Sequence, residues 1–513
     1  MPVRAICLLA LLLCASWTRA ATGAAVPALA AFDTEMQAFM ARWQIPGAAL
    51  AVARGGRLVL ARGYGVADHS TGEPVQPDSL FRIASVSKSV TAAAVMQLVE
   101  RGLISLDTAV FPYLARGTPV DARLNRITVR HLLQHSGGWD RTLTFDPVAN
   151  ALPVASDMGV PAPPDTATLV RWLLGQPLQF DPGTREAYSN IGYVLLGEVI
   201  AKASGQRYED QVRTMLLATG ITRMRLGASL PAGRLAGEVV YHMPVGTPPG
   251  RSQFASLPGP VPAPYGGVPI ELAGAAGGWV ASAIDLVAFG AAVDGQTQRA
   301  DLMSAASLGE SLRRPGYVGA AATVWDGLGW TVLASGSRRK EGSAPGTTAL
   351  LVVRGNGTTW AALLNMRSTS DGDAMSADLD GALARAHGSV TTWPTGDAFP
   401  SLHGPAPIDG CFGRPGFDAG RLCLPVVDVP GLGRYTATLN LTDAASFTFD
   451  LVTAMPALGS SGDPATFDAV RGQLTVPTVL LSSPGAAPTA YRATLVQVPG
   501  PGLRLRLLDA APR

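Results

Sequence analysis

The sequence contains few charged residues and no concentration of one sign of charge. Only 15% of its 513 residues are charged, and 40 basic residues nearly balance 38 acidic ones. The absence of a dense basic run argues against a protein that binds nucleic acid through its phosphates. Because 47% of the residues are hydrophobic, the chain can bury a large core, and its length predicts more than one domain.

Several well-known functional motifs are also missing. No G-x-S-x-G is present, which disfavours a nucleophile-elbow hydrolase, and no G-x-x-x-x-G-K-[ST] supports nucleotide binding. His131 and His135 are four residues apart, but they lack the Glu of H-E-x-x-H and an obvious third ligand. We therefore favour structural roles for both histidines and expect neither a metal nor an organic cofactor.

Long apolar runs are scarce, and the clearest one lies at the N-terminus. "MPVRAICLLALLLCASWTRAATGAA" has a basic residue, Arg4, before an apolar stretch, Ala5 to Cys14, that is too short to span a bilayer. Small residues follow, with candidate cleavage sites at Ala20, Ala21 and Ala24. The pattern predicts a signal peptide over residues 1–24 and an exported protein, periplasmic or secreted, without a membrane span after its removal. A retained N-terminal anchor is the alternative.

Cysteine is rare as well, with four residues in the whole chain. Cys7 and Cys14 lie in the expected signal peptide, which leaves Cys411 and Cys423. In an oxidising compartment, two cysteines that close a short loop favour a disulfide. Two free buried thiols are the alternative.

The order of patterns along residues 30–386 predicts one catalytic domain. "IPGAALAVARGGRLVLARGYGVAD" reads as a hairpin that turns at Gly55-Gly56, and strands are expected between Gly327 and Met366. Helical patterns lie between them, including "GGWVASAIDLVAFGAAV", and one more follows at 377–386. This order indicates an α+β fold (an α/β sandwich), in which the first and last strands of an antiparallel sheet meet and helices pack on it.

Two further segments differ in composition. Leu230 to Gly267 is dense in Pro and Gly and is expected to be a long loop, either covering a site or solvated. Residues 387–408 read as a linker. Residues 409–513 alternate apolar and polar residues between Gly/Pro turns, which predicts a small all-β domain.

The stretch "FRIASVSKSVTAAAVMQLVERGL" places Ser85 three residues before Lys88 at the start of an apolar helix. Residues three apart share one face of a helix. A serine hydroxyl is a weak nucleophile until a base takes its proton, and a lysine whose pKa is lowered by burial can be that base. The pair is a candidate acyl-transfer nucleophile with its activator. The alternative is a helix-capping serine and a solvated lysine.

Two other stretches add candidate partners for this serine. In "YSN", nearby lysines could lower the pKa of Tyr188 so that it shuttles protons, and the amide of Asn190 could hold the lysine and a substrate carbonyl. In "RRKEGS", which we place just before strands, Lys340 could stabilise an anionic group. Gly342 would let the backbone approach a ligand, and the N–H of Ser343 could form an oxyanion hole with that of Ser85. A buried aromatic with a capping Asn, and a charged surface turn, are the alternatives.

With these motifs in order, the stretch from about residue 30 to residue 386 resembles the serine β-lactamase and penicillin-binding-protein superfamily. It is most similar to the branch of class C β-lactamases, D-alanyl-D-alanine carboxypeptidases and esterases. Segments such as "HLLQHSGGWD" and "PGTREAYSNIGYVLLGEVI" also resemble family landmarks. The resemblance implies an antiparallel sheet flanked by helices with a mostly helical subdomain. It also implies residue roles: Ser85 as nucleophile, Lys88 as activator, Tyr188 as general base and acid, and Asn190 and Lys340 in substrate and transition-state contacts.

The sequence departs from the family pattern at Glu341, where true β-lactamases commonly have Thr. An acidic residue there would repel the carboxylate of a β-lactam, although Arg338 and Arg339 could compensate. We therefore expect an exported serine hydrolase that acts through an acyl-enzyme on a small-molecule ester or amide or on a peptide, and that is esterase-like. One alternative is a class C-type β-lactamase or D-Ala-D-Ala carboxypeptidase. Another is a non-catalytic protein that binds cell-wall material or a partner.

Overall fold

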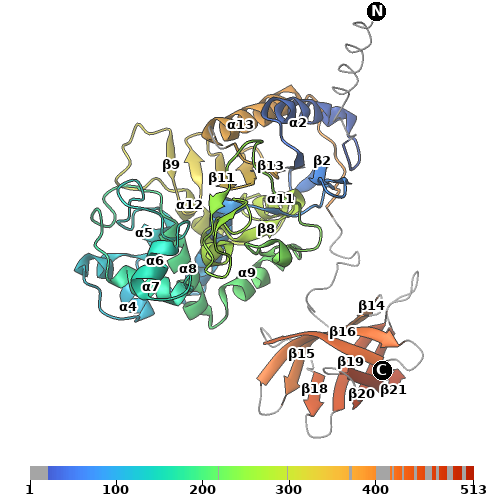
Figure 1. Cartoon of the computed structure of the whole chain (residues 1–513). Coiled ribbons are helices and arrows are strands. Elements are labelled where there is room, and N and C mark those ends of the chain that lie inside the picture. The colour runs from blue at the N-terminus through green and yellow to red at the C-terminus, as the bar shows by residue number, and fades with distance from the viewer. Residues whose placement is uncertain are drawn as a thin grey trace, which may run out of the picture. The chain divides into compact units, whose positions relative to one another are not determined.

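The computed structural model describes residues 21–217, 219–296, 298–368 and 372–399, and beyond them the strands of the last part of the chain. Contacts between residues divide the chain into two compact units, Met1–Phe399 and Pro400–Arg513 (Figure 1). Among the described residues, no helix has both the length and the apolar character needed to cross a bilayer. The predicted signal peptide lies almost entirely outside the described residues.

An eight-stranded antiparallel sheet forms the centre of the first unit. Its strands are β1 (Gly47–Arg54), β2 (Arg57–Asp68), β3 (Glu73–Pro74), β9 (Val324–Asp326), β10 (Thr331–Leu333), β11 (Arg338–Ala344), β12 (Thr347–Val353) and β13 (Thr358–Leu364). Their order is β3-β2-β1-β13-β12-β11-β10-β9. As predicted, the first hairpin turns at Gly55-Gly56, and the first and last long strands pair, from Ala48 opposite Leu364 to Arg54 opposite Thr358.

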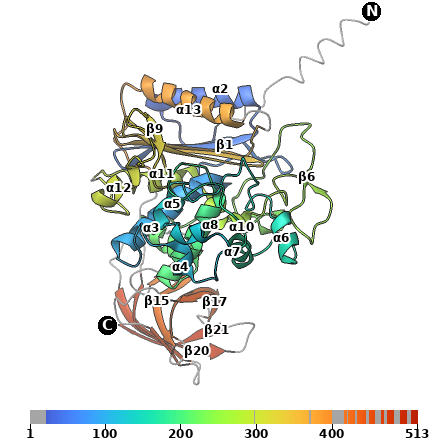
Figure 2. The same cartoon turned by 90° about the vertical axis from the view of Figure 1, so that its left-hand side faces the viewer.

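Both faces of this sheet are covered by helices. On one face lie α2 (Ala30–Trp43) and α13 (Gly372–Ser389), and on the other lies α11 (Ala283–Ala291) (Figure 2). In β1, Leu50 and Val52 pack toward α2 and α13, whereas Ala49 and Ala51 join the core on the opposite face. The alternation follows from the two-residue period of a strand, and because both faces are buried, the strand is apolar throughout.

The remaining helices of the first unit build the region that carries the candidate motifs. They are α3 (Ser87–Glu100), α4 (Val110–Leu114), α5 (Val129–Leu133), α6 (Leu152–Met158), α7 (Thr166–Leu174), α8 (Asn190–Ser204), α9 (Tyr208–Leu217), α10 (Ile270–Gly277) and α12 (Ala305–Leu312), with short 3-10 helices η1 (Pro27–Leu29), η2 (Ala84–Val86), η3 (Ala122–Arg126) and η4 (Pro231–Gly233). Most residues of α3 are buried, including its polar residues Ser87, Ser89 and Thr91.

Two local predictions were wrong. The expected helix "GGWVASAIDLVAFGAAV" begins with a strand, β8 (Trp279–Ala281), which pairs with β4 (Phe81–Arg82) and β5 (Arg225–Leu226), and only its second half is the helix α11. The residues "RRKEGS" were placed just before strands, but they lie in the strand β11 itself, which also rules out the alternative of a surface turn. β8 is a strand because it pairs with two strands from distant parts of the chain, and β11 is a strand because it pairs with the neighbouring β12 along its whole length. In both cases strand pairing outweighs local preference. The long segment 230–267 contains only η4 and two short strands, β6 (Gly250–Arg251) and β7 (Pro260–Val261), as expected for a loop.

The second unit is described only through its strands, which form one eight-stranded sheet. They are β14 (Gly416–Asp418), β15 (Arg421–Val429), β16 (Gly433–Asp443), β17 (Thr448–Pro456), β18 (Ala465–Asp468), β19 (Gln473–Leu481), β20 (Thr489–Val498) and β21 (Arg504–Pro512). A small apolar core includes Leu424, Leu474 and Leu495. Cys423 belongs to β15, but Cys411 lies outside the described residues, so the disulfide stays a prediction. The predicted linker also lies partly there, while α13 extends to Ser389.

Candidate active site

Ser85 lies in η2, at the entrance to α3, and its side chain is half-buried. The residue before it, Ala84, has a φ of 43°, in the left-handed region that costs a residue with a Cβ atom about 1 kcal/mol or more. The surrounding packing therefore holds this backbone in an unfavourable conformation. Such strain is characteristic of segments that present a functional side chain.

Lys88 lies one turn further along and is completely buried. Its Nζ is 3.1 Å from Ser85 Oγ, 2.7 Å from Asn190 Oδ1 and 2.6 Å from the carbonyl oxygen of Ala276. Ala276 lies in the last turn of α10, whose carbonyls have no partner within the helix. Lys88 satisfies one of these carbonyls, and Thr91 Oγ1 donates to its neighbour, Ala275, at 2.7 Å.

Burial lowers the pKa of Lys88 well below its usual value, and the nearby cation Lys340 lowers it further. A neutral amine has two N–H groups and one lone pair. The two N–H groups can donate to Asn190 Oδ1 and the Ala276 carbonyl, which leaves the lone pair for the proton of Ser85 Oγ. The geometry thus suits Lys88 to act as the base that activates Ser85.

Tyr188 lies on the other side of the serine, and its hydroxyl donates to Ser85 Oγ at 2.7 Å. Lys88 Nζ and Lys340 Nζ lie 4.8 and 5.6 Å from the centre of its ring. We expected such cations to lower the pKa of Tyr188, but burial raises it, against the smaller lowering effects of the hydrogen bond to Ser85 and of Arg141. The phenol is therefore protonated at neutral pH, which suits a proton donor to a leaving group.

Asn190 begins α8, and its amide makes two directed contacts. Oδ1 accepts from Lys88, and Nδ2 donates to Asp146 Oδ2 at 2.5 Å. Asp146 was not identified from the sequence, because it belongs to no motif and lies in a loop 44 residues before Asn190. Nothing in the sequence around Asp146 marks it as a partner of Asn190, and the contact forms only when the loop folds against α8.

The strand β11 brings the third motif to the same place. Lys340 is 4% exposed, and burial lowers its pKa. A Cβ atom on Gly342 would lie 2.1 Å from the carbonyl oxygen of Ile83 and 3.0 Å from the backbone nitrogen of Ser85. Only glycine allows this approach between β11 and the nucleophile segment. Ser343, the next residue, is exposed, and its suggested oxyanion role stays a prediction.

Glu341 is half-buried, and its carboxylate lies 3.4 Å from the guanidinium of Arg339. Arg339 also pairs with Asp380 of α13 at 2.6 Å. The negative charge of Glu341 is therefore partly offset by one of the two arginines that precede Lys340. The other, Arg338, is buried and donates to the carbonyl of Val293.

A cavity of about 140 Å³ opens beside Tyr188 and Asn190. Besides Tyr188, three aromatic rings line it, those of Trp139, Phe145 and Trp172. Asp140, the residue after Trp139, accepts from Thr142 Oγ1 at 2.6 Å and from Arg185 at 2.8 Å. Such an aromatic wall can accept an apolar group of a ligand.

The two histidines support the structure around Tyr188 and the preceding turn. His131 completes the capping box of α5 by accepting from the N–H of Thr128. His135 packs against the ring of Tyr188 at 4.3 Å and accepts from the N–H of Ser189 at 3.2 Å. In the part of the chain that the structure describes, no group of three or more His, Cys, Asp or Glu side chains is arranged to hold a metal ion.

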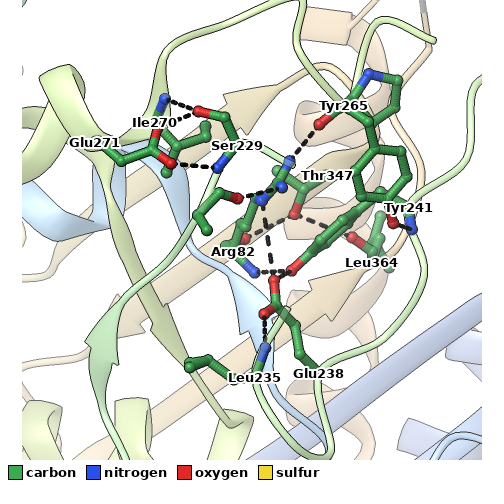
Figure 3. A network of polar contacts seen from close by, with 12 residues as sticks. Arg82, Ser229, Leu235, Glu238, Tyr241, Tyr265, Ile270, Glu271, Thr347 and Leu364 are labelled. Carbon is green, nitrogen blue, oxygen red and sulfur yellow. Dashed lines mark hydrogen bonds and ion pairs between the residues drawn. The ribbon is translucent and has the colours of Figure 1, made fainter. Parts of the chain in front are cut away.

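Arg82, three residues before Ser85, is the centre of a buried network (Figure 3). Its guanidinium lies over the ring of Tyr241 at 4.4 Å and over that of Tyr265 at 5.5 Å, and donates to the carbonyl of Pro264 at 2.6 Å. Its backbone N–H donates to the Tyr241 hydroxyl at 2.7 Å, which in turn donates to Glu238 at 2.6 Å. The long loop is therefore not simply solvated, since its aromatic residues contact the segment that leads to Ser85.

The same loop continues into α10. Ser229 Oγ accepts from the N–H of Ile270 at 2.8 Å, and the N–H of Ser229 donates to Glu271 at 2.8 Å (Figure 3). These contacts fix the first turn of the helix whose last turn binds Lys88. One continuous segment thus contacts both the strand before Ser85 and the amine beside it.

Comparisons with known proteins agree with this arrangement. Residues 32–384 match the family model described as Beta-lactamase. Esterase EstB of Burkholderia gladioli is 35% identical over 170 residues, which are 32% of this chain and 42% of EstB. The chain matches less than half of the length of such curated relatives.

Two solved structures share the fold. One is D-amino acid amidase from Ochrobactrum anthropi SV3 complexed with L-phenylalanine amide, with a TM-score of 0.55 and 22% identity, covering 71% of this chain and 99% of that chain. The other is the octameric penicillin-binding protein homologue from Pyrococcus abyssi, with a TM-score of 0.55 and 19% identity, covering 93% of this chain and 99% of that chain. At these identities the likeness concerns the fold.

Proposed function

Because the chain belongs to the β-lactamase family, we propose that it is a serine hydrolase that cleaves a carboxylic ester or amide through an acyl-enzyme on Ser85, with esters preferred. One observation carries the proposal: Ser85 Oγ lies within hydrogen-bond distance of both Lys88 Nζ and the Tyr188 hydroxyl. This pair gives the serine a base on one side and an acid on the other. The N-terminal pattern supports export as part of the same proposal.

The proposed reaction needs only this chain and water. As Ser85 Oγ attacks the carbonyl carbon, its proton passes to Lys88, and the oxyanion binds the backbone N–H groups of Ser85 and Ser343. The tetrahedral intermediate collapses, the bond to the leaving group breaks, and the leaving group takes the proton of Tyr188. Lys88 then returns its proton to the tyrosinate through a solvent molecule, because Ser85 Oγ is now bonded to the acyl group. Water hydrolyses the acyl-enzyme by the same proton path in reverse, which frees the acid and restores Ser85.

The preference for esters rests on Glu341 and on the cavity. A carboxylate beside Lys340 disfavours a substrate with its own carboxylate, such as a β-lactam, and the aromatic cavity offers a place for an apolar acyl group. EstB, a relative named as an esterase, is consistent with this preference. The alternative of a class C-type β-lactamase or D-Ala-D-Ala carboxypeptidase is favoured by Lys340, a buried cation beside Tyr188 that could bind such a carboxylate.

The first experiment compares the protein with its Ser85→Ala variant on a short-chain p-nitrophenyl ester. We expect turnover by the protein and none by the variant, while Ser70→Ala, at an exposed serine, serves as a control that keeps its activity. A fluorophosphonate probe followed by peptide mass mapping should label Ser85. If neither protein cleaves the ester, a cephalosporin and a D-Ala-D-Ala peptide test the alternative. If the probe does not label Ser85, the serine is not a nucleophile, and a binding role takes the place of catalysis.

A further inference from the structure

Asp146 is a carboxylate that the reaction described above does not use, although it lies next to the machinery. It belongs to the loop between α5 and α6, and its side chain is only 14% exposed. Oδ1 accepts from the N–H of Val148 at 3.0 Å, and Oδ2 accepts from Asn190 Nδ2 at 2.5 Å. Both oxygens are therefore held, so the position of the carboxylate is well defined relative to α8.

A carboxylate can only accept hydrogen bonds, and this decides which way the amide of Asn190 points. An Asn amide has one accepting oxygen and one donating NH₂ group. Because Asp146 takes the NH₂ group, the oxygen must face the opposite side, where Lys88 Nζ lies at 2.7 Å. If the amide rotated by half a turn, its NH₂ group would face the amine, and Lys88 would lose one of its two hydrogen-bond acceptors other than Ser85.

We propose that Asp146 is a positioning residue of the active site, which acts through Asn190 to hold Lys88 beside Ser85. The proposal deepens the serine hydrolase function and rests on it. Asp146 does not touch the reacting atoms. It fixes the orientation of one amide, and that amide fixes the amine that takes the proton of the nucleophile.

The charge of Asp146 adds a second effect that can be measured. Burial and Lys340 lower the pKa of Lys88, whereas the carboxylate of Asp146 raises it. The other groups near the amine are Arg141, which lowers this pKa, and the rings of Tyr188 and Tyr193, at 4.8 and 5.5 Å. Arg141 is half exposed and pairs with Asp146 at 3.9 Å, so it offsets part of the carboxylate's charge. The effect of Asp146 on the pKa of Lys88 is nevertheless larger than the opposing effect of Arg141.

Asp146→Asn tests both effects, because it keeps the size of the side chain and removes its charge. We expect kcat to fall about tenfold or more, with a smaller change in KM, since the amide of Asn190 is no longer fixed. We also expect the acidic limb of the profile of kcat/KM against pH to move to lower pH, because Lys88 then loses its proton more readily. A residue that only stabilised the loop would not move this limb.

Asp140→Asn is the matched control in the same loop. Its carboxylate binds Thr142 and Arg185 and has no contact with Asn190 or Lys88, so its loss should leave the acidic limb in place even if it lowers the melting temperature. Asp146→Glu is a second variant, which should keep the limb near its original pH while lowering kcat, because the charge remains but the longer side chain shifts the amide.

The rate at which the fluorophosphonate labels Ser85, measured across the same pH range, distinguishes failure of the hydrolase proposal from failure of the role proposed for Asp146. If the unchanged protein is not labelled, the hydrolase proposal fails and this inference fails with it. If the unchanged protein is labelled and Asp146→Asn has the same labelling rate, kcat and acidic limb, only the role of Asp146 is refuted. A fall in activity in proportion to the loss of folded protein, with the limb unmoved, likewise refutes it.

Discussion

Replacing Gly342 by alanine should separate β11 from the segment that carries the nucleophile. The added Cβ atom would lie 2.1 Å from the carbonyl oxygen of Ile83 and 3.0 Å from the nitrogen of Ser85. Both are backbone atoms, so no side-chain rotation can relieve the contact. Since a relaxed contact between carbon and oxygen is about 3.3 Å, the two segments must move apart by about 1.2 Å.

A displacement of this size acts on the proposed oxyanion hole, whose two N–H groups come from the two segments that separate. Loss of one such donor typically lowers kcat by about 100-fold or more, and a misplacement of about 1 Å has a similar effect. We therefore expect Gly342→Ala to lower kcat on a p-nitrophenyl ester by about 100-fold, with a smaller change in KM.

Gly309→Ala provides the matched control, because a Cβ atom at that position in α12 meets no atom within 4 Å. It should keep its activity and, as alanine favours a helix, its stability. Thermal melting of both variants shows whether they are folded. If Gly342→Ala is folded and has the kcat of the unchanged protein, β11 does not form part of the oxyanion hole, and the role assigned to Ser343 is wrong.

Two further predictions concern the base and the network behind the nucleophile. The acylation rate should rise with pH as Lys88 loses its proton, and the midpoint should lie below the ordinary pKa of lysine because burial and Lys340 lower the pKa of Lys88. Lys88→Met should be inactive over the whole pH range, and a midpoint at the ordinary pKa of lysine would contradict a buried base. Tyr241→Phe should lower kcat about tenfold, because the backbone N–H of Arg82 loses its acceptor. Tyr265→Phe keeps that hydrogen bond and should have a smaller effect. Equal kcat values for the two variants at equal folded fraction would show that the network does not position Ser85.

The sequence predicted secondary structure correctly where neighbouring residues alone determine it. Turn residues predict the Gly55-Gly56 hairpin, and apolar residues predict the helix after Ser85. The motif residues Ser85, Lys88, Tyr188 and Asn190 indeed come together, as the resemblance implied.

The errors share a different cause. The strand β11 carries Arg, Lys and Glu in place of the β-branched and aromatic residues typical of strands, and it is a strand because β12 pairs with it along its whole length. Asp146 and Arg82 belong to no motif, and their partners come from other parts of the chain. The direction of the pKa shift of Tyr188 depends on how deeply the ring is buried, which a sequence does not state.

The contacts of Lys88 also bear on when the proposed active site is completed as the chain folds. Its three partners are separated from it in sequence by 3, 102 and 188 residues. Contacts over such separations form late, because the chain must first close large loops. Helical structure can therefore appear well before the base has all its partners. Recovery of the proposed activity during refolding would mark the last steps of assembly. Partial unfolding of the segment around α10 would abolish that activity while most of the core remained folded.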